Sequence, residues 1–275
     1  MPPALTVKDR LYIDGGEVYS LTKDGFYGST YVVDLTKSWT TSTLSGTGYT
    51  RDRNFAAARR PQLFYDESHD MVYSQAGQVY GSLARPTELF SYAPPQVWGF
   101  KPDAVADGTV TWSEVYSKEL TTTFPYVSNA ENALSASSDK KHYSLGGSIG
   151  FLFNNSDTSS RGELSMNQFL TYDYATQTFE NKTHPTHYIQ GEAQYVPTYG
   201  EEGVLVFFAG KTPTDRNVAD DNFADTGIIL VYDIHNDKFY NQSATNAPVG
   251  RYNLCSVGAG NAGNNSYEMY VRIPI

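Results

Sequence analysis

The stretch VLVFFAG at 204–210, followed after a polar loop by IILVYDIHNDKFYNQ at 228–242, indicates how this chain folds. Its apolar and aromatic residues come in short runs, and each run ends in turn-forming residues, which is typical of β-strands. The preceding run, AQYVPTYG at 193–200, ends in the same way. Residues 191–242 therefore predict four short β-strands joined by turns.

The same four-strand pattern recurs through the rest of the chain. The predicted units cover residues 4–50, 61–116, 131–182 and 191–242, and residues 251–275 supply only two strands of a fifth unit. The second strand of each complete unit ends in two small residues. From one unit to the next, the second of these residues recurs about every 60 to 70 positions. This spacing indicates propeller blades with long loops. Because no Pro/Ser-rich linker separates the units, the sequence predicts one all-β domain over residues 1–275.

Glycines at the ends of the second strands are expected to have a structural role. They permit a β-bulge or a close backbone approach where a side chain would clash. The set comprises Gly15, Gly16, Gly77, Gly146, Gly147 and Gly210. A Tyr-Asp pair ends the third strand of two units, and we expect the carboxylates of Asp173 and Asp233 to accept hydrogen bonds from the turn that follows.

Large aromatic residues stand in the fourth segment of each complete unit. Because a large ring buries much apolar area, we expect these residues to be buried between neighbouring sheets. They are Trp39, Trp112, Phe179 and Phe239.

The composition favours an all-β protein and argues against several function classes. The 22 Tyr and 14 Phe suit half-buried sheet faces. The formal net charge of −10 argues against nucleic-acid binding, because an acidic surface repels phosphate backbones. No apolar run approaches the length of a membrane span, and the N-terminus does not read as a signal peptide. The single cysteine, Cys255, excludes an intrachain disulfide, and its context LCSV predicts a buried strand residue.

The order strand, Gly-Gly, loop, Tyr-Asp, spacer and Trp or Phe resembles the kelch repeat. LYIDGGE at 11–17, YVPTYGEEGVLVFFAG at 195–210 and VYDIHNDKFYNQSATNAPVGRYNLCSV at 231–257 resemble fungal kelch-repeat proteins, some of which are predicted to lie at the cell surface or in the wall. The resemblance implies a kelch-type β-propeller of the galactose oxidase/kelch superfamily. It also implies an extracellular or membrane-anchored location in full-length relatives.

The chain departs from that family in its number of repeats. Kelch propellers usually have six or seven blades, whereas this sequence predicts four complete four-stranded blades and a partial fifth over residues 251–275. We therefore expect an incomplete or open ring and a truncated gene product. Open blades expose strand edges, which promotes association.

Long loops between the second and third strands are candidate binding elements, and solvated surface is the alternative of equal weight. They cover about 17–28, 78–95, 148–167 and 211–226. The last loop contains four aspartates: Asp215, Asp220, Asp221 and Asp225. Carboxylates can hold calcium, but their spacing does not match an EF-hand, and an acidic surface loop is the favoured interpretation.

The remaining candidate chemistry is weak. His184 and His187 stand three apart in THPTHY, where Pro185 indicates a surface loop rather than a zinc site. A copper-radical site of galactose oxidase type needs a Tyr–Cys crosslink, a second Tyr and two His, which this sequence does not match. No sialidase box, GxSxG elbow or phosphate loop occurs. Four N-glycosylation sequons occur, at Asn154, Asn181, Asn241 and Asn264. They are compatible with an extracellular protein, but their number is near that expected by chance.

Taken together, these features predict a non-enzymatic binding or interaction module with a protein or glycan partner. The sequence predicts no metal site, no cofactor and no membrane segment. The alternative is an extracellular carbohydrate-active or galactose-oxidase-like propeller whose catalytic part is missing or not recognisable. A third possibility is a non-functional truncated product.

Overall fold

A computed structural model describes most of the chain as β-structure. The described residues are 4–15, 17–19, 24–26, 29–40, 42–50, 58–59, 61–75, 78–79, 96–102, 111–117, 132–149, 164–214, 222–261 and 266–272. They form strands and contain no α-helix. The chain divides into two compact units: unit 1 is Met1–Glu131 with Leu152–Asp157, and unit 2 is Asn132–Phe151 with Thr158–Ile275.

Unit 1 contains two four-stranded antiparallel sheets. The first has the order β1 (Ala4–Val7), β2 (Arg10–Asp14), β5 (Ser29–Asp34) and β6 (Thr47–Thr50). The second has the order β12 (Ser113–Ser117), β11 (Gln96–Phe100), β9 (Met71–Gln75) and β8 (Gln62–Asp66). Two-stranded ribbons pair β3 (Glu17–Tyr19) with β4 (Asp24–Phe26), and β7 (Ala58–Arg59) with β10 (Gln78–Val79).

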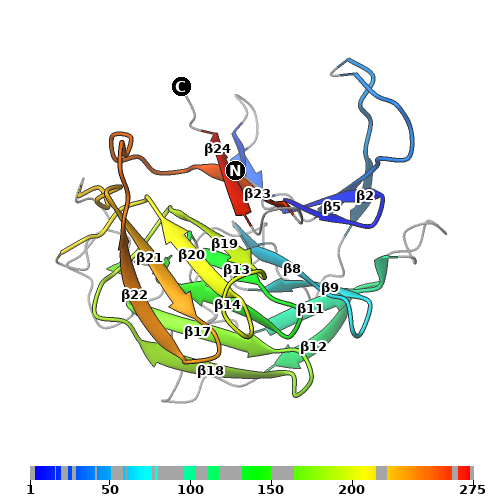
Figure 1. The fold of residues 1–275 in the computed structure, drawn as a ribbon. Helices are drawn as coiled ribbons and strands as arrows, with labels where there is room; N and C mark the ends of the chain where they lie inside the picture. The colour runs from blue at the N-terminus through cyan, green and yellow to red at the C-terminus, as the bar shows by residue number, and fades with distance from the viewer. Residues whose placement is uncertain are drawn as a thin grey trace. The chain divides into compact units, whose positions relative to one another are not determined.

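Unit 2 repeats this arrangement. Its first sheet has the order β13 (Leu134–Ser137), β14 (Lys141–Leu145), β17 (Gln168–Asp173) and β18 (Thr178–Thr183). The second has the order β19 (Glu192–Val196), β20 (Val204–Phe208), β21 (Ile228–Asp233) and β22 (Lys238–Ser243), side by side in Figure 1. The remaining pairs are β15 (Ser148–Ile149) with β16 (Leu164–Ser165), and β23 (Cys255–Asn261) with β24 (Ser266–Arg272).

The position of the glycine-ended strands was predicted correctly. β2, β9, β14 and β20 each come second in their sheet along the chain, and each pairs with a strand on both sides. Near the end of these strands the backbone takes a positive φ, at Gly15 (62°), Gly146 (70°) and Ala209 (57°). A Cβ on Gly146 would overlap the carbonyl oxygen of Tyr188, in the link to the next sheet. Glycine is therefore required there by the close approach as well as by the backbone angle.

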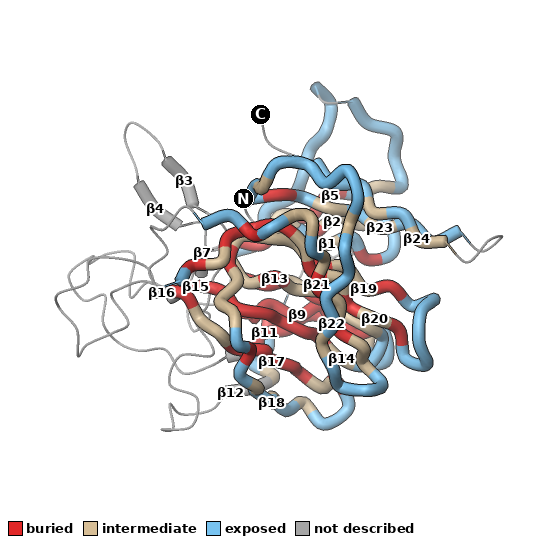
Figure 2. Tube along the Cα trace, turned by 60° about the vertical axis from the view of Figure 1, so that its left-hand side comes forward, coloured by how far each residue is buried: buried red, intermediate tan, exposed pale blue. Residues whose placement is uncertain are grey.

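Each unit has its own core between its two four-stranded sheets. In unit 1 the buried cluster includes Tyr12, Phe100 and Trp112. In unit 2 it includes Tyr143 and Phe169, with other residues of β13, β14 and β19 to β21. Figure 2 shows the buried stretches along inner strands such as β9 and β11 and the exposed ones at turns. Aromatic packing between sheets thus builds both cores.

Three burial predictions are wrong. Trp39 is 52% exposed and lies outside any strand, because the fourth strand of its sheet is formed by Thr47–Thr50 instead. Cys255 does begin a strand, β23, but it is exposed. Conversely, His184 is buried rather than on the surface, with its ring 4.7 Å from that of Phe239.

Candidate functional site

A polar cleft lies within unit 2, between the sheet of β13, β14, β17 and β18 and the sheet of β19 to β22. Its volume is about 680 Å³. We call it the inter-sheet cleft. Its lining residues come from β14, β17, β18, β19 and β21 and from the turns that follow β13, β19 and β21. They are Ser138, Asp139, Lys140, Lys141, Tyr143, Thr171, Glu180, Lys182, Tyr195, Pro197, Glu201, Glu202, Tyr232, Ile234 and Asp237.

Local sequence explains how two turns bring their charges into the cleft. The Ser138 hydroxyl accepts hydrogen bonds from the backbone N–H groups of Lys140 and Lys141, both at 3.2 Å, which closes the turn after β13. In the turn after β19, Gly200 and Gly203 take φ values of 72° and 80°, which L-residues rarely adopt. These glycines let the chain bend tightly enough to present Glu202 toward Lys140.

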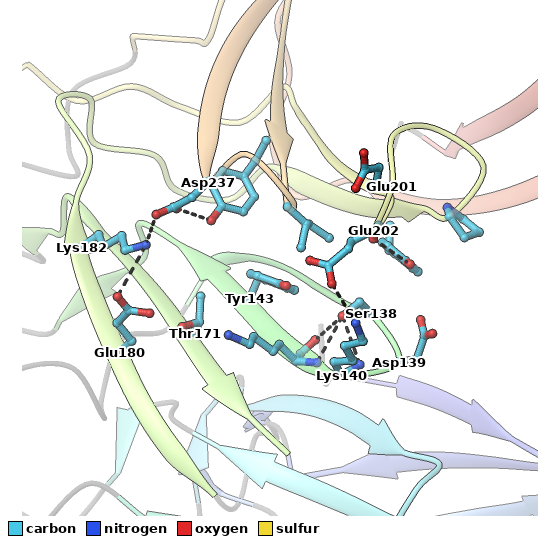
Figure 3. Close-up of a pocket in the computed structure, with 15 residues that line it drawn as sticks. Ser138, Asp139, Lys140, Tyr143, Thr171, Glu180, Lys182, Glu201, Glu202 and Asp237 are labelled. Atoms are coloured by element: carbon cyan, nitrogen blue, oxygen red, sulfur yellow. Dashed lines mark hydrogen bonds and ion pairs between the residues drawn. The ribbon is translucent and has the colours of Figure 1, made fainter. Parts of the chain in front are cut away.

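Five charged side chains of the cleft form two separate ion-paired groups, shown at its two ends in Figure 3. At one end Lys140 Nζ lies 2.8 Å from Glu202 Oε1. At the other end Lys182 Nζ lies 2.5 Å from Asp237 Oδ2 and 3.5 Å from Glu180 Oε1. Tyr143 and Thr171 lie between the two groups. The cleft thus offers charged groups at both ends and hydroxyl groups in the middle.

Three tyrosines contribute ring surface and hydroxyl groups to the cleft. The Tyr232 hydroxyl donates to Asp237 Oδ1 at 2.5 Å, and the Tyr195 hydroxyl donates to the Glu202 carbonyl oxygen at 3.2 Å. Burial raises the pKa of Tyr143 to about 12, and burial together with the Asp237 hydrogen bond raises the pKa of Tyr232 further above its usual value. These tyrosines are therefore neutral hydrogen-bonding groups at neutral pH.

Four of the paired charges, those of Lys140, Glu202, Lys182 and Asp237, are stabilised in their ionised forms. The hydrogen bond from Lys140 lowers the pKa of Glu202, and the same bond raises the pKa of Lys140. Likewise, hydrogen bonds from Lys182 and Tyr232 lower the pKa of Asp237, and the Asp237 bond raises the pKa of Lys182. Each of these pKa values moves away from neutrality. These four groups therefore hold fixed charges and do not exchange protons near pH 7.

Two positions of the cleft are more polar than their counterparts in unit 1. Strand register places Tyr143 opposite Thr171 in unit 2 and Tyr12 opposite Val32 in unit 1. In the hairpin turn, Ser138 stands where Val7 stands in unit 1. Both valines belong to the buried core of unit 1, whereas Ser138 and Thr171 line the cleft.

A further carboxyl group with a shifted pKa, that of Glu192, lies outside the cleft on β19. Burial raises the pKa of Glu192 to about 7, although a hydrogen bond partly opposes this shift by lowering the pKa. That bond comes from the Ser256 hydroxyl on β23, at 3.0 Å, and Ser256 in turn accepts a hydrogen bond from Gln194 Nε2 at 2.8 Å. Glu192 is thus a titratable link between two neighbouring sheets.

The structure places the predicted site residues in several different settings. Gly16, Gly77, Asp215, Asp220 and Asp221 lie outside the described residues. Asp225 is exposed, and its carboxylate accepts a hydrogen bond from the Gly227 N–H at 2.8 Å. Gly147 and Gly210 have φ values of 94° and 88°, and their N–H groups donate to the carbonyl oxygens of Tyr188 and Arg251.

The Tyr-Asp pairs and the aromatic residues have local structural partners. Asp173 accepts hydrogen bonds from the N–H and hydroxyl of Thr176, and Asp233 accepts them from Asn236. Trp112 is buried in the core of unit 1. Phe239 packs 5.0 Å from Phe169 on the neighbouring sheet, whereas the half-buried Phe179 packs 4.8 Å from Tyr172 of its own sheet.

Three histidines of unit 2, of which His142 and His184 are buried, have local partners as well. His184 Nδ1 accepts the Thr186 N–H at 3.1 Å, and burial lowers its pKa. His187 Nδ1 lies 3.0 Å from the Ser165 hydroxyl. Burial lowers the pKa of His142 to about 3. Within the described residues, no three His, Cys, Asp or Glu side chains gather in a way that would hold a metal ion.

Sequence analysis did not single out the residues of the inter-sheet cleft. One signal was present: the equivalent positions of the four third strands hold Val32, Gly99, a threonine and Val231, and only the threonine has a hydroxyl group. That threonine is Thr171. The ion pairs gave no such signal, because Lys140 and Glu202 are 62 residues apart and meet only when the sheets pack.

Comparison with known proteins identifies a likeness of fold. No model of a known protein family matches the chain, and no curated protein matches it. Among solved structures, one titled "Structure of YjhT" matches with a TM-score of 0.58 at 10% identity, covering 98% of this chain and 81% of that one. The sheets and this likeness are consistent with a β-propeller. At that identity the likeness concerns the fold alone.

The β-propeller fold agrees with the antiparallel four-stranded sheets of both units.

None of the described segments is a helix with the length and hydrophobicity of a membrane span.

Proposed function

We propose that this protein is a non-enzymatic binding module of kelch-propeller type, and that the inter-sheet cleft is its ligand site. The chemistry of the cleft's ion pairs carries the proposal. A general acid or base needs a pKa near the working pH, whereas Lys140, Lys182, Glu202 and Asp237 all have pKa values shifted away from neutrality. Such groups are suited to orient a ligand rather than to transfer a proton.

A glycan is the partner that this lining favours. Ligand sites combine ring surface with a few placed polar groups. Tyr143, Tyr195 and Tyr232 supply rings, and Thr171 and Ser138 supply hydroxyls that both donate and accept hydrogen bonds. The carboxylates accept and the lysines donate. A hydroxyl-rich ligand can match this mixture without carrying a charge of its own.

The wider architecture supports the propeller part of the proposal. Equivalent sheets recur in both units, and the repeat pattern of the sequence resembles fungal kelch proteins. We propose that all the sheets belong to one domain over residues 1–275, with blades at about 4–50, 61–116, 131–182 and 191–242 and a partial blade over 251–275. A cell-surface or cell-wall association fits a glycan-binding role.

The test is binding of neutral oligosaccharides, screened on an array and measured by titration calorimetry. We expect at least one oligosaccharide to bind, and Thr171→Val and Glu180→Gln to weaken it at least about tenfold, because each removes a hydrogen-bonding group of the cleft. Thr178→Val is the matched control, since Thr178 is exposed on β18 outside the cleft. Saccharide binding that these cleft variants leave unchanged would place the site elsewhere, and absence of any saccharide binding would contradict the glycan ligand.

Metal analysis of the purified protein separates this proposal from the oxidase alternative. A binding module is expected to contain substoichiometric copper. Copper at one equivalent per chain would favour a galactose-oxidase-like protein and overturn the non-enzymatic assignment.

A further inference from the structure

Two of the four sequons fall on the outermost strands of the sheets in unit 2. Asn181-Lys182-Thr183 ends β18, and Asn241-Gln242-Ser243 ends β22. Each of these strands comes last in the order of its sheet. The other two sequons, at Asn154 and Asn264, lie outside the described residues.

The two asparagines occupy the same place in their sheets. Asn181 pairs with Leu170 and Asn241 pairs with Leu230. Leu170 and Leu230 each stand three residues before the Asp that ends the third strand. A repeated position of this kind is not required by the fold, since nothing in strand packing calls for Asn followed by a hydroxyl residue two positions later.

Both sequons present the groups that glycosylation needs. Asn181, Thr183, Asn241 and Ser243 are all exposed. In an extended strand, residues two apart point to the same face. The side-chain amide and the hydroxyl residue of each sequon therefore lie together on an accessible surface, the arrangement in which an Asn-X-Ser/Thr acceptor can be recognised.

We propose that Asn181 and Asn241 are N-glycosylation sites, and that their glycans cover the outer edges of the two sheets. In the reaction, the amide nitrogen Nδ2 forms a bond to the anomeric carbon of an oligosaccharide that is supplied on a lipid diphosphate. The bond between that carbon and the phosphate oxygen breaks, the lipid diphosphate leaves, and the amide nitrogen loses one proton. No oxidant or reductant takes part.

The position of the sites gives the glycans a physical role. An outermost strand presents unpaired backbone N–H and C=O groups, which can pair with a strand of another molecule. On β22 the exposed ring of Tyr240 adds apolar surface beside this edge. A hydrated glycan on the same strand would prevent a second chain from approaching. On β18, Asn181 alternates with Glu180 and Lys182, which line the cleft, so its glycan would project away from the cleft.

Glycopeptide mapping of the protein isolated from its natural source tests the modification. Enzymatic release of N-glycans in heavy-oxygen water converts each occupied Asn to a labelled Asp. We expect the label at residues 181 and 241 and not at Asn236, an exposed turn residue without a hydroxyl residue two positions later. Unlabelled peptides at both sequons would overturn the proposal.

Variants of the protein, produced in a host that attaches N-glycans, separate recognition from folding and test the edge-covering role. Asn181→Gln and Thr183→Ala should each remove one glycan from the intact mass, whereas Thr183→Ser keeps the sequon and should retain it. The pair Asn181→Gln and Asn241→Gln together should increase self-association in sedimentation velocity. Loss of the glycan in Thr183→Ser would contradict the recognition argument, and unchanged self-association of the double variant would overturn the edge-covering role.

Discussion

Each unit contains one junction between two four-stranded sheets, and the two junctions use the same positions differently. Tyr12 in unit 1 and Tyr143 in unit 2 occupy equivalent places on the second strand. In unit 1 the tyrosine packs 5.2 Å from Phe100 and donates to the Pro102 carbonyl oxygen at 3.3 Å. In unit 2 it lies 6.1 Å from Tyr232, and both rings line the inter-sheet cleft.

The residues around these tyrosines explain the difference. Val7 and Val32 close around Tyr12, whereas Ser138 and Thr171 stand at the equivalent places beside Tyr143. Replacing valine by a hydroxyl residue of similar size retains the backbone but makes burial costly. One junction therefore serves mainly as core, and its counterpart combines a buried core with a polar cleft that can bind a ligand.

Buried carboxyl groups show a related contrast between the units. In unit 1 Asp14 accepts hydrogen bonds from two hydroxyls, those of Thr30 at 2.6 Å and Ser74 at 2.8 Å. In unit 2 Glu192 accepts a bond from Ser256 at 3.0 Å. Both carboxyl groups connect neighbouring sheets through a serine. Asp14 thus accepts bonds from hydroxyls of two strands, whereas the bond to Glu192 comes from β23 alone.

The largest expected effect comes from removing the aromatic ring at the centre of each junction. Phe100→Ala should cost about 3–5 kcal/mol, because Phe100 is 1% exposed and packs on both Tyr12 and Trp112. Phe239→Ala should cost about 2 kcal/mol, because Phe239 is only partly buried. Urea unfolding measures both, with the exposed Trp39→Ala as a control at less than about 0.5 kcal/mol. An equal loss at Phe100 and Phe239 would contradict the contrast between the junctions.

The glycine at the end of β14 has the next largest expected effect. Gly146 and Gly200 have nearly the same φ, 70° and 72°. A Cβ on Gly146 would meet the Tyr188 carbonyl oxygen, whereas a Cβ on Gly200 would have no neighbour closer than 3.8 Å. Gly146→Ala should therefore cost about 3 kcal/mol or more, and Gly200→Ala about 1 kcal/mol, the cost of the backbone angle alone. Equal losses in urea unfolding would show that the close approach is unimportant.

Glu192 makes the stability of unit 2 depend on pH. Its pKa is about 7 in the folded protein and 4.5 in the unfolded chain, so the folded state binds the proton more tightly. This contribution to stability is complete below pH 4.5 and is lost as the pH rises through 7, by at most about 3 kcal/mol.

Glu192→Gln should abolish this part of the pH dependence. The variant should be more stable than the native protein at pH 8 and not at pH 4.5, as measured by urea unfolding across that range. An unaltered pH profile in Glu192→Gln would refute the assignment of Glu192 as the titrating group.

Local patterns in the sequence predicted the strands but not the contacts between distant segments. Alternating apolar runs and Tyr-Asp turns are local signals, and most strands of the four-stranded sheets follow them. The short strands β3, β4, β10, β15 and β16 were not predicted, because they lie in stretches that the sequence predicted as long loops. Trp39 shows where this fails. A Trp five residues after Asp34 looks equivalent to Phe239, but the chain makes a longer excursion before Thr47–Thr50 pairs with β5. Nothing in the adjacent residues reports that excursion.

The candidate site was less predictable than the fold because it depends on pairs of residues that meet only through packing. Lys182 and Asp237 are 55 residues apart, and each alone reads as an ordinary surface charge. The predicted acidic loop was chosen from charge density, which says little about geometry, and three of its residues, Asp215, Asp220 and Asp221, lie outside the described residues. Comparing equivalent positions between repeats would have been more informative, since Thr171 is the one hydroxyl residue where the other repeats hold Val32, Gly99 and Val231.

Exchanging residues at the equivalent positions gives the smallest expected change in stability and tests the comparison most directly. Val32→Thr should destabilise unit 1 by about 1–2 kcal/mol, because the core around Tyr12 offers its hydroxyl a buried apolar setting. Thr171→Val should change stability by less than about 1 kcal/mol, because the hydroxyl faces a polar cleft and the two side chains have similar volume. If Thr171→Val costs more than Val32→Thr in urea unfolding, Thr171 is a structural hydrogen-bonding residue. The difference between the junctions would then reflect stability rather than ligand binding.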